Sequence, residues 1–271
     1  MHQRTLGRTA TSLPVIGMGS SNTFDVGTSA TDRAPLAEVL RALHEAGGRA
    51  VDTSPMYGRS ETVLGDLIEQ MRPRPPFWMA TKVWTQGREA GARQIAASMQ
   101  ALHVNKLDLL QIHNLLDWRE HVPTLHALRD AGKVRFIGIT HYRADAHANL
   151  QSVLAAERFD CVQLNYSLAE REAEQRLLPY CQEHGIGVIV NRPFADGAMF
   201  QRVKDKPLPD WADELGIYSW GQYFLKWIVG HPAVTCVIPA TANARHMQDN
   251  CRAGFGPLPD AKQRERMAAA W

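Results

Sequence analysis

The segment LDLLQIH, residues 107–113, is a strand-like run of apolar residues that ends in a histidine. Strands of a parallel sheet that is covered on both faces are almost continuously apolar, whereas half-exposed strands alternate apolar and polar residues. Residues 107–112 and the run GVIV, residues 187–190, fit the continuous pattern better. These segments therefore predict buried parallel strands.

Runs of this kind recur at intervals of roughly 25 to 35 residues, with stretches of helical apolar spacing between them. The expected strands are PVIGMG (14–19), RAVDTS (49–54), WMATKV (78–83), LDLLQIH (107–113), VRFIGIT (134–140), CVQLNYS (161–167), GVIVNRP (187–193) and CVIPAT (236–241). Expected helices include residues 35–47, 61–71, 88–102, 121–132 and 143–157. This alternation predicts an α/β fold, the (β/α)8 TIM barrel, which commonly uses about 250 residues. We therefore expect a single barrel domain over residues 1–271.

Two segments fall outside the strand–helix repeat. RTLGRTATSLP, residues 4–14, predicts a short N-terminal hairpin that turns at Gly7 and Arg8. The longest irregular stretch, residues 194–216, follows the seventh expected strand. Insertions at such places in barrels usually belong to the active face, so we expect this stretch to contact a substrate or cofactor.

The composition excludes several classes of function. Hydrophobic residues make up 45% of the chain and charged residues 21%, and the formal net charge is +2. These values suit a soluble globular protein and give no sign of nucleic-acid binding. No apolar run approaches the roughly 20 residues that span a bilayer, and the first residues lack an apolar signal core, so we expect a cytoplasmic protein. The cysteines have neither CxxC nor zinc-ligand spacing, so we expect free thiols and no metal site at Cys161, Cys181, Cys236 and Cys251.

Four polar residues lie at or just past the ends of three successive expected strands: Asp52, Tyr57, Lys82 and His113. All strand ends of a barrel open onto one face, so these side chains are expected to be neighbours. A lysine within a buried strand is costly unless it is paired with an anion. Asp52 on the adjacent strand is the obvious partner for Lys82.

Each of these residues also has a structural interpretation. Lys82 and Asp52 alone could be a structural ion pair, and a lone His113 is more often a hydrogen-bonded core residue. Tyr57 favours catalysis, because a neighbouring cation favours the phenolate and lowers the pKa of a phenol from about 10. Beside the other three, His113 becomes a candidate donor to a substrate oxygen. No serine or cysteine nucleophile with a partner base stands out, so we predict protonation of an oxygen.

Several segments of the chain together resemble a known protein family. DTSPMYGRSE (52–61), ATKVW (80–84) and LDLLQIHN (107–114) resemble the Asp, Tyr, Lys and His tetrad of the aldo-keto reductase family, in the family's order and with similar spacing. The resemblance extends to the family's cofactor-binding segments at GITHYR (138–143), VQLNYS (162–167) and IPATANARHMQDN (238–250). It implies reduction of an aldehyde or ketone by a nicotinamide cofactor, NADPH in most of the family, held without a Rossmann fold.

The resemblance also assigns roles to the four residues. Tyr57 would give the carbonyl oxygen its proton, Lys82 would tune Tyr57, and Asp52 would hold Lys82. His113 would orient the carbonyl and stabilise the negative charge that develops on it.

Three positions correspond to residues that hold the nicotinamide. Thr140 and His141 stand where the family usually has the Ser and Asn that bind the carboxamide, and Gln163 matches its amide-binding glutamine. His141 is a departure, because a neutral imidazole offers one donor and one acceptor at different angles. Arg192 ends the seventh strand, where many members place an aromatic ring, and we expect it to stack on the nicotinamide or to contact a phosphate. A surface role for Arg192 is the alternative.

A helix start follows the eighth strand and is a ready site for phosphate. Thr241 and Asn250 fit the family's pattern for the 2′-phosphate. The usual Lys and Arg positions hold Ala240 and His246, although Arg245 next to His246 could substitute. NADPH is therefore the expected cofactor in preference to NADH.

Two tryptophans are expected at the substrate. Trp84 and Trp118 follow the third and fourth strands, where loops of the mouth would form an apolar wall. The tail at residues 252–271 is short and polar beside the long lid of many relatives, so we expect an open pocket for a small carbonyl compound. No obligate protein partner is evident.

Two other functions stay open from the sequence. The family includes channel-associated members, so a nicotinamide-binding regulatory or sensor subunit with little turnover is one alternative. An unrelated barrel hydrolase is the other, and it would need metal ligands or a carboxylate pair at the strand ends.

Overall fold

The computed structural model describes residues 1–271, and its centre is an eight-stranded sheet in which all neighbouring strands are parallel. The strands follow chain order, and parallel bridges from Ile16 to Val237 and from Gly19 to Ala240 join the two ends of the sheet into a barrel. They are β3 (Met18–Gly19), β4 (Ala50–Asp52), β5 (Trp78–Val83), β6 (Leu107–His113), β7 (Val134–Thr140), β8 (Cys161–Asn165), β9 (Gly187–Asn191) and β10 (Cys236–Val237). The predicted (β/α)8 barrel and its eight strands are confirmed.

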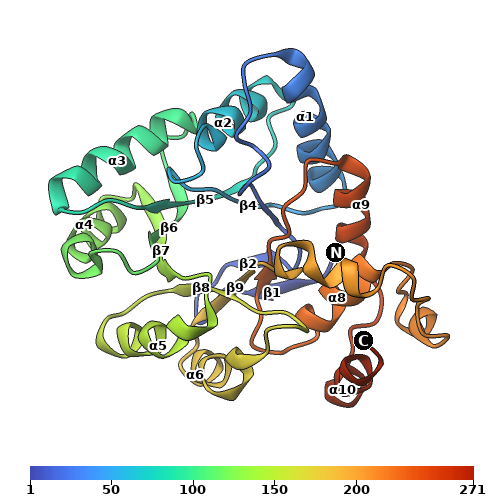
Figure 1. Ribbon diagram of the computed structural model, residues 1–271. Coiled ribbons are helices and arrows are strands. Elements are labelled where there is room, and N and C mark those ends of the chain that lie inside the picture. The colour runs from blue at the N-terminus through green and yellow to red at the C-terminus, as the bar shows by residue number, and fades with distance from the viewer.

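The helices surround the ring of strands (Figure 1). They are α1 (Ala30–Glu45), α2 (Ser60–Gln70), α3 (Arg88–Ala101), α4 (Trp118–Asp130), α5 (His147–Ala156), α6 (Leu177–Glu183), α7 (Ala198–Arg202), α8 (Trp220–Val229), α9 (Ala244–Arg252) and α10 (Ala261–Ala270). Helix α1 begins earlier than expected because Ser29 caps it and accepts a hydrogen bond from the backbone N–H of Asp32. No helix combines the length and apolar character needed to cross a membrane.

The predicted N-terminal hairpin is present and closes the end of the barrel at which the strands begin. Its strands β1 (Gln3–Thr5) and β2 (Ser12–Pro14) are antiparallel. The backbone N–H of Arg8 donates to the carbonyl of Gly185, just before β9, over 2.8 Å. Leu6 and Leu13 are buried in a small cluster with apolar side chains of the barrel strands, including Leu109. The hairpin therefore plugs the end opposite the carboxyl ends of the strands.

Apolar packing divides into two layers. The cluster inside the barrel contains ten buried residues, and the larger one, of 59 residues, includes the residues between strands and helices. Cys161 and Cys236 belong to the inner cluster, and Cys181 and Cys251 to the outer one. All four are buried free thiols, as the sequence predicts. Buried polar side chains of the barrel, Asp52 and Lys82 among them, lie near the carboxyl ends of their strands.

The irregular stretch at residues 194–216 contains short helices in addition to loop. These are η3 (Ala195–Gly197), α7 and η4 (Ala212–Leu215); two further turns, η1 (Ala144–Ala146) and η2 (Glu172–Gln175), precede α5 and α6. Phe194 and Phe200 pack together with ring centroids 4.9 Å apart, and both contact Phe224 of α8. Because these two rings also line the cavity at the strand ends, the first half of the stretch lies at the carboxyl ends of the strands. Its contact with a substrate or cofactor stays a prediction.

The first prediction concerns the hairpin turn. Gly7 has a φ of 53°, and a methyl group there would lie 2.3 Å from the carbonyl oxygen of Gly185 and 2.6 Å from the nitrogen of Gly187. We expect Gly7→Ala to lower the free energy of unfolding by about 2 kcal/mol or more, because overpacking adds to backbone strain. Urea denaturation measures this loss.

Gly47→Ala is the matched control. Gly47 also has a positive φ, 84°, but no atom lies within 4 Å of the added methyl group. The free energy of unfolding of Gly47→Ala should fall by only about 1 kcal/mol, the cost of placing alanine at a positive φ. Equal losses in the two variants would show that the hairpin is not packed tightly against the start of β9.

Candidate active site

The four residues expected to catalyse the reaction meet at the carboxyl ends of the strands. Asp52 is the last residue of β4, His113 the last of β6, and Lys82 the last but one of β5, while Tyr57 lies in the turn after β4. A cavity of about 610 Å³ opens there, and Asp52, Tyr57 and His113 are among its lining residues. The structure therefore brings together the groups that the sequence placed on three separate strands.

The ion pair between Lys82 and Asp52 lies in the barrel interior. The Lys82 Nζ lies 2.6 Å from Asp52 Oδ2 and donates a second hydrogen bond to the carbonyl oxygen of Thr53 over 2.7 Å. Burial alone would lower the pKa of the Lys82 ammonium, but its attraction to the Asp52 carboxylate and to the Tyr57 oxygen outweighs burial and raises the pKa. Lys82 is therefore a cation at all physiological pH values.

Tyr57 lies against this cation, but its pKa moves in the direction opposite to the prediction. The Lys82 Nζ is 4.9 Å from the centroid of the Tyr57 ring. Burial raises the pKa of Tyr57 above its ordinary value, and the opposing charge of Lys82 only partly compensates. Lys82 thus acts in the predicted direction, but the expected net fall of the Tyr57 pKa is wrong because burial outweighs the cation: the sequence showed the charge but not the depth of burial.

His113 is a neutral imidazole in contact with Tyr57. Their rings are perpendicular, with centroids 5.8 Å apart. Burial, together with the charges of Lys82 and His141, lowers the pKa of His113 to about 3. The hydroxyl oxygen of Ser54 lies 3.0 Å from its Nδ1, a contact that no sequence motif indicated. At neutral pH, His113 can thus take part in hydrogen bonds without adding a charge.

Amide side chains extend the polar network across the barrel. Asp52 Oδ1 accepts hydrogen bonds from Gln111 Nε2 at 3.1 Å and from Gln163 Nε2 at 2.8 Å. Gln163 Oε1 accepts from Thr140 Oγ1 at 3.2 Å and from Asn191 Nδ2 at 3.3 Å. Thr140 and Gln163 line the cavity as expected, but the protein already uses the amide of Gln163 on both sides.

Asn191 was missed by the sequence analysis, which stopped at the next residue, Arg192. Asn191 ends β9 and lines the cavity, and its Oδ1 has no hydrogen-bond partner in the protein. The signal was available, because a polar residue ends the apolar run GVIVN in the way that His113 ends its own strand. A ligand with an N–H group, such as a carboxamide, would supply the partner that this acceptor lacks.

Arg192 and His141 are placed differently from the other expected cofactor residues. The Arg192 guanidinium is held by Asp196, at 2.9 to 3.1 Å, and by the carbonyl of Tyr142 at 2.9 Å. Glu170 lies 3.5 Å away on its other side. Arg192 lines the cavity, but its charge is already balanced within the protein. The His141 ring stacks on Tyr142 and is absent from the cavity lining.

Three expected cofactor residues follow β10. Asn243 caps α9 by accepting from the backbone N–H of Arg245, and Thr241 Oγ1 accepts from the N–H of Asn243. The Arg245 side chain is exposed and forms no ion pair, whereas Asn250 is buried. Ala240 lines the cavity. This end of the site thus offers a helix N-terminus beside one unpaired cation.

The two expected substrate residues differ in their positions. Trp84 is 40% exposed and its ring centroid lies 6.5 Å from that of His113, although Trp84 is not among the residues that line the cavity. Trp118 begins α4, packs against the hydrophobic core and does not line the cavity. The structure does not bring Trp118 to the site. Apolar lining residues that the sequence analysis did not name one by one include Met56, Tyr142, Phe194 and Phe200, and the last two lie in the stretch 194–216 that it expected at the site.

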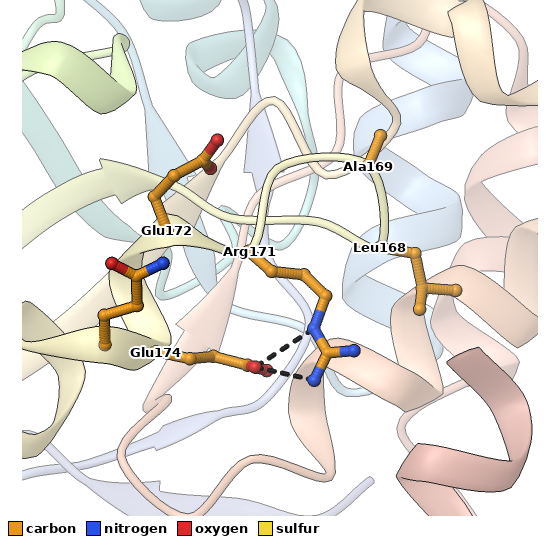
Figure 2. Close-up of a pocket in the computed structure, with 6 residues that line it drawn as sticks. Leu168, Ala169, Arg171, Glu172 and Glu174 are labelled. Carbon is orange, nitrogen blue, oxygen red and sulfur yellow. Dashed lines mark hydrogen bonds and ion pairs between the residues drawn. The ribbon is translucent and has the colours of Figure 1, made fainter. Parts of the chain in front are cut away.

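A second hollow, about 500 Å³ in volume, lies beside the segment that follows β8 (Figure 2). In Figure 2, Arg171 extends towards Glu174, to which it donates two hydrogen bonds of 3.0 and 2.7 Å. Arg171 also donates to Glu265 over 2.8 Å. The charge of Arg171 is therefore paired within the protein. None of the four catalytic candidates lines this hollow.

Comparison with known proteins agrees with the geometry. The model of the Aldo/keto reductase family matches residues 15–270. Methylglyoxal reductase YeaE of Escherichia coli (strain K12) is 28% identical over 247 residues, covering 88% of this chain and 84% of that protein. The NADH-specific methylglyoxal reductase of the same strain is 27% identical over 265 residues, covering 84% and 78%. An aldo/keto reductase from Klebsiella pneumoniae, crystallised with NADP and acetate, has a TM-score of 0.80 at 26% identity, covering 95% of this chain and 91% of that chain.

The neutral state of His113 predicts how stability depends on pH. The pKa of His113 is about 3 in the folded protein, whereas an unfolded histidine has a pKa of about 6.5. Between these values the unfolded chain binds a proton that the folded one does not, so stability falls as the pH falls. We expect His113→Gln to reduce this loss by about 1 kcal/mol per pH unit between about pH 6 and pH 4.

Urea denaturation at a series of pH values measures the effect. His2→Gln, which replaces an exposed histidine, serves as the control. The same pH dependence in His113→Gln and in the wild type would contradict a buried neutral imidazole.

Proposed function

This chain belongs to the aldo/keto reductase family and is an oxidoreductase that acts on carbonyl groups, and we propose that it reduces an aldehyde or ketone to an alcohol with NADPH, with Tyr57 as the general acid. One observation carries the proposal: Tyr57 lies against the buried Lys82–Asp52 pair and beside a neutral His113, at a cavity large enough for a small substrate. A phenol, a cation and an imidazole in this arrangement suit protonation of an oxygen.

Tyr57 provides the proton. Because burial raises its pKa, the phenol is fully protonated before reaction. As the proton leaves, the Lys82 ammonium beside the ring stabilises the phenolate, and Asp52 holds Lys82 in place. His113 orients the carbonyl and places a hydrogen bond where negative charge develops.

The residues present fit a nicotinamide dinucleotide. The nicotinamide would supply the hydride, while Thr140 and Asn191 would hold its carboxamide end, next to Gln163. The unpartnered Oδ1 of Asn191 supports this fit. Thr241 and Asn250 would hold the other end near α9, and the paired charge of Arg192 favours a role in shaping the mouth over contact with phosphate.

NADPH is proposed over NADH because of Arg245. It is the unpaired cation nearest the start of α9, where a 2′-phosphate would bind. Ala240 and His246 replace the cations expected there, and one relative is named as NADH-specific, so the preference is expected to depend on this single arginine.

The mouth favours a small carbonyl compound with an apolar group. Met56, Trp84, Tyr142 and Phe200 are each at least 38% exposed, and three of them line the cavity while Trp84 faces His113. Trp84 is therefore proposed as a substrate contact, and Trp118 as a core residue.

Tyr57→Phe tests the general acid. It keeps the ring but removes the proton, so we expect the rate of NADPH-dependent reduction of an aldehyde to fall by at least about a hundredfold. The affinity for NADPH should change little. Absorbance of the reduced nicotinamide measures turnover, and fluorescence titration measures binding. Residual activity within a few-fold of the wild type would exclude the assignment, and tight binding without turnover in the wild type would favour a sensor subunit instead.

Arg245→Gln tests the cofactor preference. Loss of this cation should raise KM for NADPH about tenfold, since a charge-assisted hydrogen bond is worth about 1.5–3 kcal/mol when it is fully formed. KM for NADH should stay within about twofold, because NADH lacks the 2′-phosphate. Arg252→Gln, at the other end of α9, is the control. Equal changes for both cofactors would contradict the role of Arg245.

A further inference from the structure

Ser54 connects the turn that carries Tyr57 to the imidazole of His113. Its side chain is fully buried, and its Oγ lies 3.0 Å from His113 Nδ1. Two residues later, the backbone N–H of Met56 donates to the same oxygen over 3.2 Å. The backbone N–H of Tyr57 donates to the Ser54 carbonyl over 3.0 Å. One residue is thus bonded to the imidazole and to the turn that carries the phenol.

The two nitrogens of His113 have different surroundings. Nδ1 faces Ser54, whereas Nε2 has no hydrogen-bond partner in the protein. Nε2 is not a buried atom, and the ring lines the cavity. This nitrogen therefore opens onto the space for substrate. Because the imidazole is neutral, only one nitrogen carries a proton. Which nitrogen it is decides whether His113 donates to a substrate oxygen or repels it.

The hydrogen bonds of Ser54 favour a bare Nδ1 on His113. The Ser54 oxygen already accepts from the N–H of Met56, and the hydroxyl has no acceptor in the protein other than His113 Nδ1. Donation to Nδ1 therefore satisfies the buried hydroxyl hydrogen, the Nδ1 lone pair and the Met56 N–H together. The opposite tautomer would leave the hydroxyl hydrogen buried without a partner, which is costly.

We propose that Ser54 is a positioning residue that fixes His113 as the Nε2–H tautomer, so that His113 donates a hydrogen bond to the carbonyl oxygen of the substrate. The tautomer follows from the burial and the contacts of His113, and only its use in catalysis rests on the proposed function. Tyr57 and His113 then both present donors to one oxygen, and the turn at residues 54–57 holds the two donors together. Pro55 stiffens this turn because its ring fixes φ.

The experiment is nitrogen-15 NMR of histidine-labelled protein near pH 7, with the His113 signals assigned by their loss in His113→Gln. We expect the wild type to show a protonated Nε2 and a bare, hydrogen-bonded Nδ1. In Ser54→Ala the Nδ1 resonance should move towards that of a nitrogen without a hydrogen bond. A protonated Nδ1 in the wild type would overturn the proposal, and this result does not depend on turnover.

Kinetics test the catalytic use of the tautomer. We expect Ser54→Ala to lower kcat/KM for an aldehyde about tenfold, with the Kd for NADPH within about twofold of the wild type. Ser54→Thr keeps the hydroxyl and should restore both the Nδ1 resonance and most of the rate. Thr53→Val is the matched control, because Thr53 is equally buried and its hydroxyl forms no hydrogen bond. The His113 Nδ1 resonance of this variant should match that of the wild type.

Two outcomes separate this proposal from the function on which its catalytic part rests. An Nε2–H tautomer in a protein that does not oxidise NADPH with any aldehyde would refute the proposed function and keep the role of Ser54 in fixing the tautomer. Active enzyme with a rate and an Nδ1 resonance unchanged in Ser54→Ala would refute the positioning role alone.

Discussion

The ion pair of Lys82 and Asp52 is the interaction on which the upper end of the barrel depends. Both residues are buried, and removing such charges from water costs several kcal/mol unless every lone pair and proton is satisfied. The hydrogen bonds of the Asp52 carboxylate come from strands that are distant in the chain. Asp52 on β4 accepts from Lys82 on β5, from Gln111 on β6 and from Gln163 on β8. Only a closed barrel brings β8 within reach of β4. Closure of the fold and burial of the charge therefore depend on each other.

The same carboxylate sets the direction of the surrounding hydrogen bonds. Because an ionised Asp52 can only accept, the amide of Gln163 must turn its nitrogen towards it and its oxygen away. That oxygen then takes hydrogen bonds from Thr140 and Asn191, whose orientations follow in turn. A second series of hydrogen bonds connects Met56 through Ser54 to His113 and shares no residue with the first. The polarity of the site is thus built into the protein before any ligand binds.

The sequence predicted what depends on position along a strand and missed what depends on side-chain direction. Apolar runs ending in polar residues were enough to locate the barrel and the meeting of Asp52, Lys82 and His113, because parallel strands present their carboxyl ends on one face. The same rule passed over Asn191, since Arg192 was the more conspicuous neighbour. The guanidinium of Arg192 faces two carboxylates. This orientation depends on the geometry of the loops, which the spacing of residues in the sequence does not encode.

Tyr57 shows why charge alone is a poor guide to an acid. A cation strong enough to dominate the phenol would leave it ionised at neutral pH, with no proton to give. In the structure, burial outweighs the charge of Lys82 and raises the pKa of Tyr57, so the proton is present at the start. The cation then favours the phenolate that forms as the proton leaves. In the proposed reaction, burial keeps the acid protonated and Lys82 lowers the cost of its ionisation, and both effects come from placing a phenol at the rim of a barrel above a buried lysine.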